Sequence, residues 1–319
     1  MAGKGGGHDA PRSSVRRMGL LTETVLEKAA RFLWTSGRVL EQRRFAHLFG
    51  SGTASGVLAA LDAYADEEGG YAFGLEPDIR GPLGQPIAVP AALRVLEEAG
   101  RMVPERLVPL CDWLAERTDP DGGVPAVLPS LRPFPHPPFM PVADDPRGDL
   151  LTTGQIAGPL LRHGTEHPWL RAAERFCRAA IEALEETHPY EAGAVVAFLD
   201  GVRDRAWAAR QGVRLGSLVR EQRIVLLDPE KPGEARPAPG YAPGEFHLPH
   251  DYAASPGSVA RAWFTDAEMD RSLQHLVAVQ EEDGGWPLPW AQWSPATAFE
   301  ARPGVTLAAL LTLRAYGSA

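Results

Sequence analysis

Two acidic side chains stand two positions apart in the segment Glu76-Pro77-Asp78-Ile79-Arg80. The proline stiffens the backbone between them, and a guanidinium follows closely in the sequence. A cation beside one carboxylate lowers its pKa, whereas a second carboxyl group in a dry site is held neutral, so such a pair can supply an acid and a base. The alternative is an ion-paired loop that anchors the next helix. We predict that Glu76, Asp78 and Arg80 form the catalytic group.

A second polar cluster follows a spacer rich in proline and glycine. His247, His250 and Asp251 carry groups that bind divalent metals or move protons. Pro249 disfavours a helix at this point, so the spacing of the two histidines does not place them on one helical face. Packing in a turn or a lid is the alternative, and we predict a flexible loop or lid near residues 228–252.

Three similar segments recur along the chain. They are LDAYADEEGGYAFG at 61–74, CDWLAERTDPDGGVPAV at 111–127 and LVAVQEEDGGWPLPW at 276–290. In each, a helix-like stretch ends in acidic or proline residues that are followed by Gly-Gly. The second glycines, Gly70, Gly123 and Gly285, are separated by 53 and 162 positions, the second spacing being about three times the first. This pattern indicates about six repeat units.

Each unit has the pattern of a helix pair. One apolar stripe at helical spacing consists of Leu170, Ala173, Cys177, Ala180, Ile181 and Leu184. Thr265 and Glu268 predict a capping box, and His188-Pro189 places proline at the first position of a helix. The Gly-Gly pairs predict left-handed helix C-caps. Because no sustained alternation indicates strands, we predict an all-α fold.

The segment QEEDGGW at 280–286 resembles the QW motif (Gln-x-x-Asp-Gly-x-Trp) of squalene–hopene and related terpene cyclases. The recurring Asp-Gly-Gly units resemble those of the terpene cyclase and protein prenyltransferase superfamily. FGLEPDIRGPLGQP at 73–86 is similar to a tract of uncharacterised actinobacterial proteins described as prenyltransferase-like. The resemblance implies a single α/α toroid, in which about six helical hairpins surround a central cavity.

Class II cyclases of this superfamily protonate an alkene or epoxide from an Asp-x-Asp-Asp motif. The nearest match here is VADD at 142–145, which lacks the first aspartate and lies in a proline-rich insert near 129–148. Asp144 and Asp145 are therefore candidates either for an acid or for a solvated loop. The Asp-x-Cys zinc ligands of the protein prenyltransferases are absent.

Tryptophans gather near the end of the chain, at Trp286, Trp290 and Trp293. Aromatic faces stabilise a carbocation without offering a base, so we expect these rings to line the cavity, with plain core packing as the alternative. The resemblance to the QW motif gives Gln280 and Trp286 a structural use as well. Gln280 can bond backbone groups at a helix end, and Trp286 can pack over the turn.

The composition narrows the classes of partner. The 319 residues carry a diffuse net charge of −9, which opposes binding to nucleic acid or to an anionic membrane surface. No apolar run is long enough to predict a transmembrane helix, and two cysteines fit a reducing cytoplasm. We expect a disordered tail at 1–17 before a domain at 18–319, and either Met1 or Met18 as the start.

These features predict an enzyme that cyclises or isomerises a small hydrophobic, isoprenoid-like substrate, with Glu76 or Asp78 as the proton donor. No cofactor is expected unless the histidine cluster binds a divalent metal. A non-catalytic toroid that binds a hydrophobic or peptide ligand is the second hypothesis. The third is a carbohydrate-active α/α barrel that uses Asp78 with Asp251 or Glu300. Since cyclases that work alone carry a second domain that closes the cavity, a single toroid would need a lid or a homodimer partner.

Overall fold

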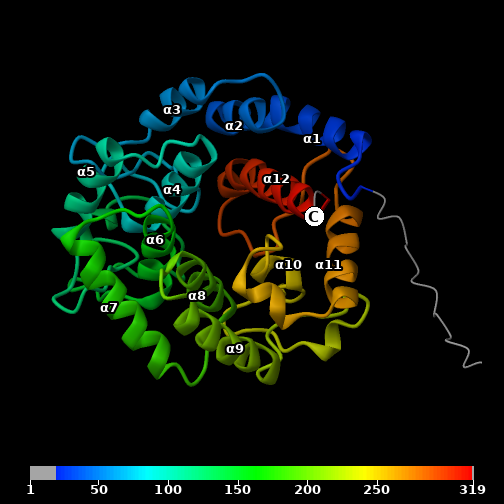
Figure 1. Cartoon of the computed structure of the whole chain (residues 1–319). Coiled ribbons are helices and arrows are strands. Elements are labelled where there is room, and N and C mark those ends of the chain that lie inside the picture. The colour runs from blue at the N-terminus through cyan, green and yellow to red at the C-terminus, as the bar shows by residue number, and fades with distance from the viewer. Residues whose placement is uncertain (1–18, 318–319) are drawn as a thin grey trace, which may run out of the picture.

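The computed structural model describes residues 19–317, so the predictions of a tail and of a start at Met1 or Met18 lie outside it. Outer and inner helices alternate around a closed ring (Figure 1). The outer helices are α1 (Glu23–Ser36), α3 (Ala54–Asp62), α5 (Pro104–Ala115), α7 (Pro168–Ala183), α9 (Arg205–Glu221) and α11 (Asp266–Ala278). The inner helices are α2 (Val39–Phe49), α4 (Val89–Glu98), α6 (Leu150–Arg162), α8 (Pro189–Gly201), α10 (Pro249–Tyr252) and α12 (Pro295–Gly317). Residues 19–317 contain no strand, only two isolated β-bridges. The predicted all-α toroid is confirmed.

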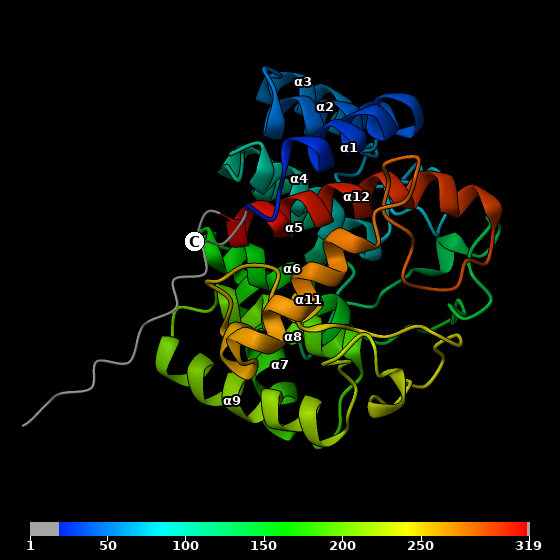
Figure 2. The same ribbon diagram turned by 90° about the vertical axis from the view of Figure 1, so that its right-hand side faces the viewer.

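The ring closes where the last helix meets the first. Helix α12 lies inside α1 and beside α2, and it packs against both (Figure 1). At its far end the hydroxyl of Tyr316 donates a hydrogen bond of 2.8 Å to the carbonyl oxygen of Ala253, just after α10. Figure 2 shows that the segments leading into α10 and α12 lie at the same end of the ring.

The helix signals in the sequence are confirmed as well. Helix α7 buries Leu170, Ala173, Cys177 and Ile181 along its predicted stripe. Thr265 and Glu268 form the capping box of α11, and α8 begins at Pro189. Both cysteines are buried free thiols, and no helix among the described residues is long and apolar enough to cross a bilayer.

The three Gly-Gly pairs form equivalent turns. The first glycine of each pair, Gly69, Gly122 and Gly284, has a φ of 99°, 103° and 95°, a conformation that favours glycine. These glycines are not helix C-caps, which corrects the prediction. Helix α3, for example, is capped by Ala63 in right-handed geometry, and the chain runs six residues further before its left-handed glycine.

The second glycine of each pair lies against an aromatic ring from an outer helix. A Cβ atom at Gly70, Gly123 or Gly285 would come within 2.5 to 2.8 Å of Trp113, Phe176 or Phe32, respectively. The Gly-Gly repeat in the sequence therefore reflects a close contact between a turn and an outer helix that recurs around the ring. This contact leaves no space for a side chain at the second glycine.

The Gly285→Ala variant is expected to lose about 1–3 kcal/mol of unfolding free energy, because its Cβ atom would overpack the Phe32 ring and the Arg302 guanidinium. Urea unfolding measures the loss. Gly193→Ala is the matched control, since Gly193 lies within α8 and a methyl group added there would have no other atom within 4 Å. The control should gain about 0.5–1 kcal/mol from helix propensity. Equal stability of the two variants would contradict the packing argument.

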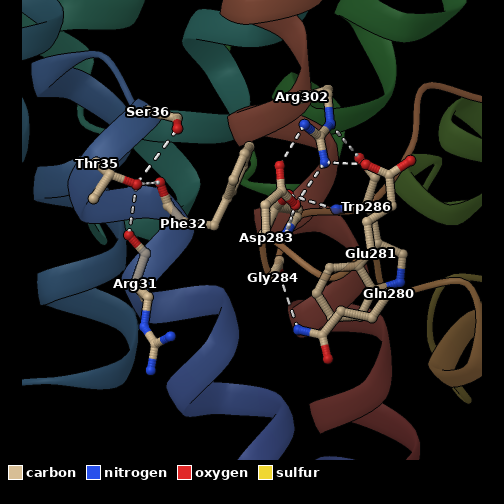
Figure 3. Close-up of polar contacts among 12 residues, drawn as sticks. Arg31, Phe32, Thr35, Ser36, Gln280, Glu281, Asp283, Gly284, Trp286 and Arg302 are labelled. Carbon is tan, nitrogen blue, oxygen red and sulfur yellow. Dashed lines mark hydrogen bonds and ion pairs between the residues drawn. The ribbon is translucent and has the colours of Figure 1, made fainter.

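The segment that resembles the QW motif joins the two ends of the ring (Figure 3). The amide nitrogen of Gln280 donates to the carbonyl oxygens of Val25 and Gly284, both at 3.0 Å. The side chain of Trp286 is only 1 % exposed, and its indole N–H donates to the carbonyl oxygen of Leu276 at 2.7 Å. Both side chains therefore hold the seam between the first and last hairpins.

Arg302 completes this seam from α12. Its guanidinium lies 4.7 Å from the centre of the Phe32 ring and binds Asp283 at 2.8 Å and Glu281 (Figure 3). Asp283 also accepts a hydrogen bond from the backbone N–H of Gly285 at 2.9 Å. The acidic residues before the Gly-Gly pair thus fix the turn and bind a neighbouring helix.

Candidate functional site

The loop between α3 and α4 carries the predicted acid pair. Ile79, 3 % exposed, packs with Val127 and Leu131 in a small separate core that includes the proline-rich insert. The backbone N–H of Arg80 donates to the carbonyl oxygen of Pro135 in that insert at 3.1 Å. The insert therefore forms a wall behind the acid loop and fixes its position.

Glu76 lies on the wall of a cavity that is lined by residues of α2, α4 and α12. Desolvation, and then the nearby charge of Asp78, raise the pKa of Glu76 to about 7. Its carboxylate accepts only one weak hydrogen bond within the described residues, from the backbone N–H of Asp78 at 3.4 Å. Glu76 can therefore carry a proton near neutral pH, as a general acid must.

Asp78 lies in a different environment two residues later. Its Oδ1 atom accepts a hydrogen bond of 3.0 Å from the indole N–H of Trp293. Desolvation raises the pKa of Asp78, while the Trp293 donor and the charge of Arg80 oppose this shift. The two carboxyl groups thus differ in their hydrogen bonds: Asp78 accepts one from an indole N–H at 3.0 Å, and Glu76 accepts a backbone N–H at 3.4 Å.

Arg80 holds the loop rather than either carboxylate. Its Nη1 atom donates to the carbonyl oxygens of Pro77 at 2.7 Å and Ile79 at 2.9 Å. Its ion pair, at 3.1 Å, is with Glu300 on α12 and not with Glu76 or Asp78. This corrects the predicted pairing: Arg80 is a positioning residue that fixes the backbone carrying the acid pair.

The cavity has a volume of about 150 Å³ and is bounded by α2, the acid loop, α4, the Trp290 segment and α12. Its charged lining residues are Arg38, Glu41, Arg44, Glu76, Asp78, Arg94 and Glu300. Its apolar lining includes Leu40, Leu75, Val95, Trp290 and Val305. The cavity therefore offers a short apolar surface together with several fixed charges.

Two ion pairs fix the charged side of the cavity. Arg38 binds Glu41 with two hydrogen bonds of 3.0 and 2.8 Å, and its Nη1 atom donates to the carbonyl oxygen of Gly74 at 2.5 Å. Arg44 binds Glu98 with two hydrogen bonds of 2.7 Å, which join α2 to α4. Such bidentate pairs hold side chains in one orientation.

Sequence reasoning missed these inner-helix charges. The only signal was charged residues within otherwise apolar helical segments, such as Arg94 within VPAALRVLEE. Such a residue is ordinarily placed on a solvated outer face. An inner helix of a toroid has one face in the core between the two layers of helices and its opposite face toward the cavity. A charged residue in an otherwise apolar inner helix can therefore line a ligand site.

The three tryptophans take three different places. Trp290 lines the cavity as predicted, and Trp293 contacts Asp78. Trp286 is not among the lining residues and packs instead with residues of α1 and α12 in the core at the seam. The expectation of three cavity aromatics is thus corrected to one lining ring and one hydrogen-bond donor.

Comparison with solved structures shows proteins of the same shape. A protein from Actinoplanes superposes with a TM-score of 0.56 at 17 % identity, over 93 % of this chain and 99 % of that one. The type II terpene cyclase MstE from Scytonema gives 0.55 at 12 % identity, over 91 % and 96 %. A variant of MstE bound to geranylgeranyl dihydroxybenzoate gives 0.54 at 12 % identity, over 92 % and 97 %. The fold is terpene-cyclase-like. No family model matches the chain, and no curated protein matches its sequence.

The acidic pair in the proline-rich insert lies outside this site. Asp144, whose side chain is 92 % exposed, binds Arg132 at 2.6 Å, and Asp145 binds Arg147 at 2.9 Å. Neither aspartate lines the cavity. This is the solvated-loop alternative, and an acid role for the two residues is not supported.

The histidine cluster also departs from its metal-binding interpretation. The Nδ1 atom of His247 lies 2.9 Å from the Tyr241 hydroxyl, and that of His250 lies 2.6 Å from the Ser272 hydroxyl. Asp251 accepts the backbone N–H of Leu248 and caps α10. Within residues 19–317 no three histidine, cysteine or acidic side chains are grouped to hold a metal.

Pro249 does not prevent a helix in this cluster. It occupies the first turn of α10, where a missing N–H costs nothing. His247 lies before this helix and His250 within it, so the two histidines do not share a helical face, as the sequence predicts. Burial lowers the pKa of His247, which favours the neutral ring. The histidine cluster thus packs in a turn. The lid that we expect near residues 228–252 stays a prediction.

Proposed function

We propose that this chain is an enzyme that isomerises or cyclises a short isoprenoid-like alkene in its central cavity, with Glu76 as the proton donor. The observation that carries the proposal is the position of Glu76 on the cavity wall, partly buried and without an ion-pair partner among the described residues. Its pKa near 7 supports the same role. The terpene-cyclase-like fold is compatible with acid-initiated chemistry of this class.

The proposed reaction needs no oxidant and no cofactor. Glu76 transfers its proton to one carbon of the double bond, which leaves a carbocation on the other carbon. The π face of Trp290 stabilises this cation. Loss of a proton from a neighbouring carbon to the carboxylate of Asp78 forms the shifted alkene. Asp78 then releases this proton to water and Glu76 takes one up from water, which restores the starting state. Cyclisation follows instead where a longer substrate supplies a second double bond that attacks the cation.

The size of the cavity limits the substrate. MstE was solved with geranylgeranyl dihydroxybenzoate, which carries a long prenyl chain. A cavity of about 150 Å³, as found here, is comparable to one that holds a single benzene molecule. The buried part of the substrate is therefore about one five-carbon unit.

Deuterium incorporation tests the proposal. The full chain is incubated in D₂O with three five-carbon alkenes: 3-methylbut-3-en-1-ol, its phosphate ester and 3-methylbut-3-enoate. Mass spectrometry of substrate and product is expected to show enzyme-dependent uptake of deuterium at carbon for at least one of them, and the rate should fall above pH 7. Absence of uptake for all three at pH 6 contradicts the proposed function, and tight binding without uptake favours a non-catalytic toroid.

A further inference from the structure

Among the described residues, Arg94 is a cavity-lining cation for which no hydrogen bond and no ion pair is found. Arg94 lies on the inner helix α4, where the side chains around it in sequence, Leu93 and Val95, belong to the core. Its own side chain is exposed to the cavity, which it lines. Its guanidinium makes no hydrogen bond and no ion pair with any other side chain of residues 19–317.

The other arginines at this site are already paired. Arg38 is bound by Glu41, Arg44 by Glu98, and Arg80 by Glu300. Desolvation, and then the positive charge of Arg44, lower the pKa of the Arg94 guanidinium, while the charges of Glu98, Glu76 and Glu97 oppose this shift. A guanidinium that no carboxylate binds directly keeps its N–H donors available for the oxyanion of a ligand.

We propose that Arg94 binds the oxyanion head group of the substrate, a carboxylate or a phosphate, while the short hydrocarbon part lies against Val95 and Trp290. The planar fork of a guanidinium matches both head groups with two parallel hydrogen bonds. This inference rests on the proposed function for the identity of the site, and it adds the class of substrate. That class is a five-carbon isoprenoid-like unit that bears an anionic oxygen group.

A bound anion would also act on the acid. Arg94 is one of the charges that lower the pKa of Glu76, so neutralising it keeps Glu76 protonated in the loaded site. By linkage, ionisation of Glu76 must weaken anion binding by the same amount. The other charged groups around this region are Arg38 just before α2, Glu41 and Arg44 on α2, Asp78 and Arg80 on the loop, Glu97 and Glu98 on α4, and Glu300 on α12.

Calorimetry with saturated five-carbon ligands tests the anion site without any turnover. The ligands are 3-methylbutanoate, 3-methylbutyl phosphate and the neutral 3-methylbutan-1-ol, and the protein is the full chain at pH 6. At least one anion is expected to bind ten-fold or more tightly than the alcohol. Arg94→Gln should remove that advantage and leave alcohol binding unchanged, which also shows that the variant is folded.

The matched control is Arg101→Gln, because Arg101 is an exposed arginine just beyond α4. It should bind the anions like the parent. Comparing the affinities of 3-methylbutanoate and 3-methylbutyl phosphate shows whether the site binds a carboxylate or a phosphate. Anions that bind no better than the alcohol, or equally well to Arg94→Gln, overturn the proposal, and so does a complete lack of binding.

A second pair of measurements separates this inference from the proposed function. The affinity of 3-methylbutanoate should fall at least three-fold from pH 6 to pH 8.5 in the parent and stay constant in Glu76→Gln. If anions bind through Arg94 but no alkene takes up deuterium, the anion site stands and the proposed function fails. If alkenes take up deuterium equally well in Arg94→Gln, the proposed function stands and the anion site fails.

Discussion

Replacing Glu76 by glutamine is expected to lower the turnover of five-carbon alkenes by about 10²- to 10⁴-fold, the usual contribution of a positioned general acid. Glutamine keeps the shape of the side chain but has no acidic proton to transfer. Because the pKa of Glu76 is about 7, the parent should be most active below pH 7 and lose activity as the pH rises through that value. Deuterium incorporation at carbon, followed from pH 5 to pH 9, measures both effects.

The matched control for this loss is Glu105→Gln, which changes an exposed glutamate at the start of α5 in the same way. It should keep the activity and the pH profile of the parent. If the Glu76 variant retains more than a tenth of the parental rate, another group donates the proton. A profile that keeps its shape in that variant leads to the same conclusion.

The architecture could be predicted because it depends on local signals. Each Gly-Gly pair needs one left-handed residue and one residue without a side chain, and only glycine meets both needs at Gly284 and Gly285. Helix starts such as Thr265 and Pro189 depend on groups within one turn of the chain. Signals of this kind recur with every hairpin and therefore appear as a repeat.

The cavity could be predicted only in part, because its contacts join distant parts of the chain. Glu76 and Asp78 are neighbours in sequence, so their pairing was visible. The binding of Arg80 by Glu300 and of Asp78 by Trp293 depends on how the ring closes, across more than two hundred residues. The apolar periodicity of a single helix does not indicate which of its faces lies toward the cavity once the ring has closed.

The place of the tryptophans shows the same limit. Trp286 and Trp290 lie four positions apart in a segment without regular structure, so no helical spacing relates them. The hydrogen bond from its indole N–H to Leu276 holds Trp286 in the core at the seam. The chain then reaches the cavity, where Trp290 is a lining residue. The residue types indicated aromatic packing, whereas the backbone path decided which ring meets a ligand.

The same Glu76→Gln variant should also show whether Glu76 is protonated in the native protein, because the free energy of unfolding depends on that proton. The pKa of Glu76 is raised from 4.5 to about 7 by folding, so the folded protein binds the proton more tightly than the unfolded chain does. The stability that this provides is fully present below pH 4.5 and is lost as the pH rises through 7. The loss corresponds to about 3 kcal/mol by pH 9.

Glutamine does not titrate, so the variant avoids this loss. Parent and variant are expected to unfold at similar urea concentrations near pH 4.5, and the variant should be about 3 kcal/mol more stable at pH 9. Glu105→Gln, which replaces an exposed carboxyl group at the start of α5, is the control for the substitution itself. A constant difference between parent and Glu76→Gln across this range would mean that folding does not raise the pKa of Glu76, so that its carboxyl group is already ionised in the native protein at neutral pH. The acid at the cavity wall would then be unavailable for proton transfer, whatever substrate the ring encloses.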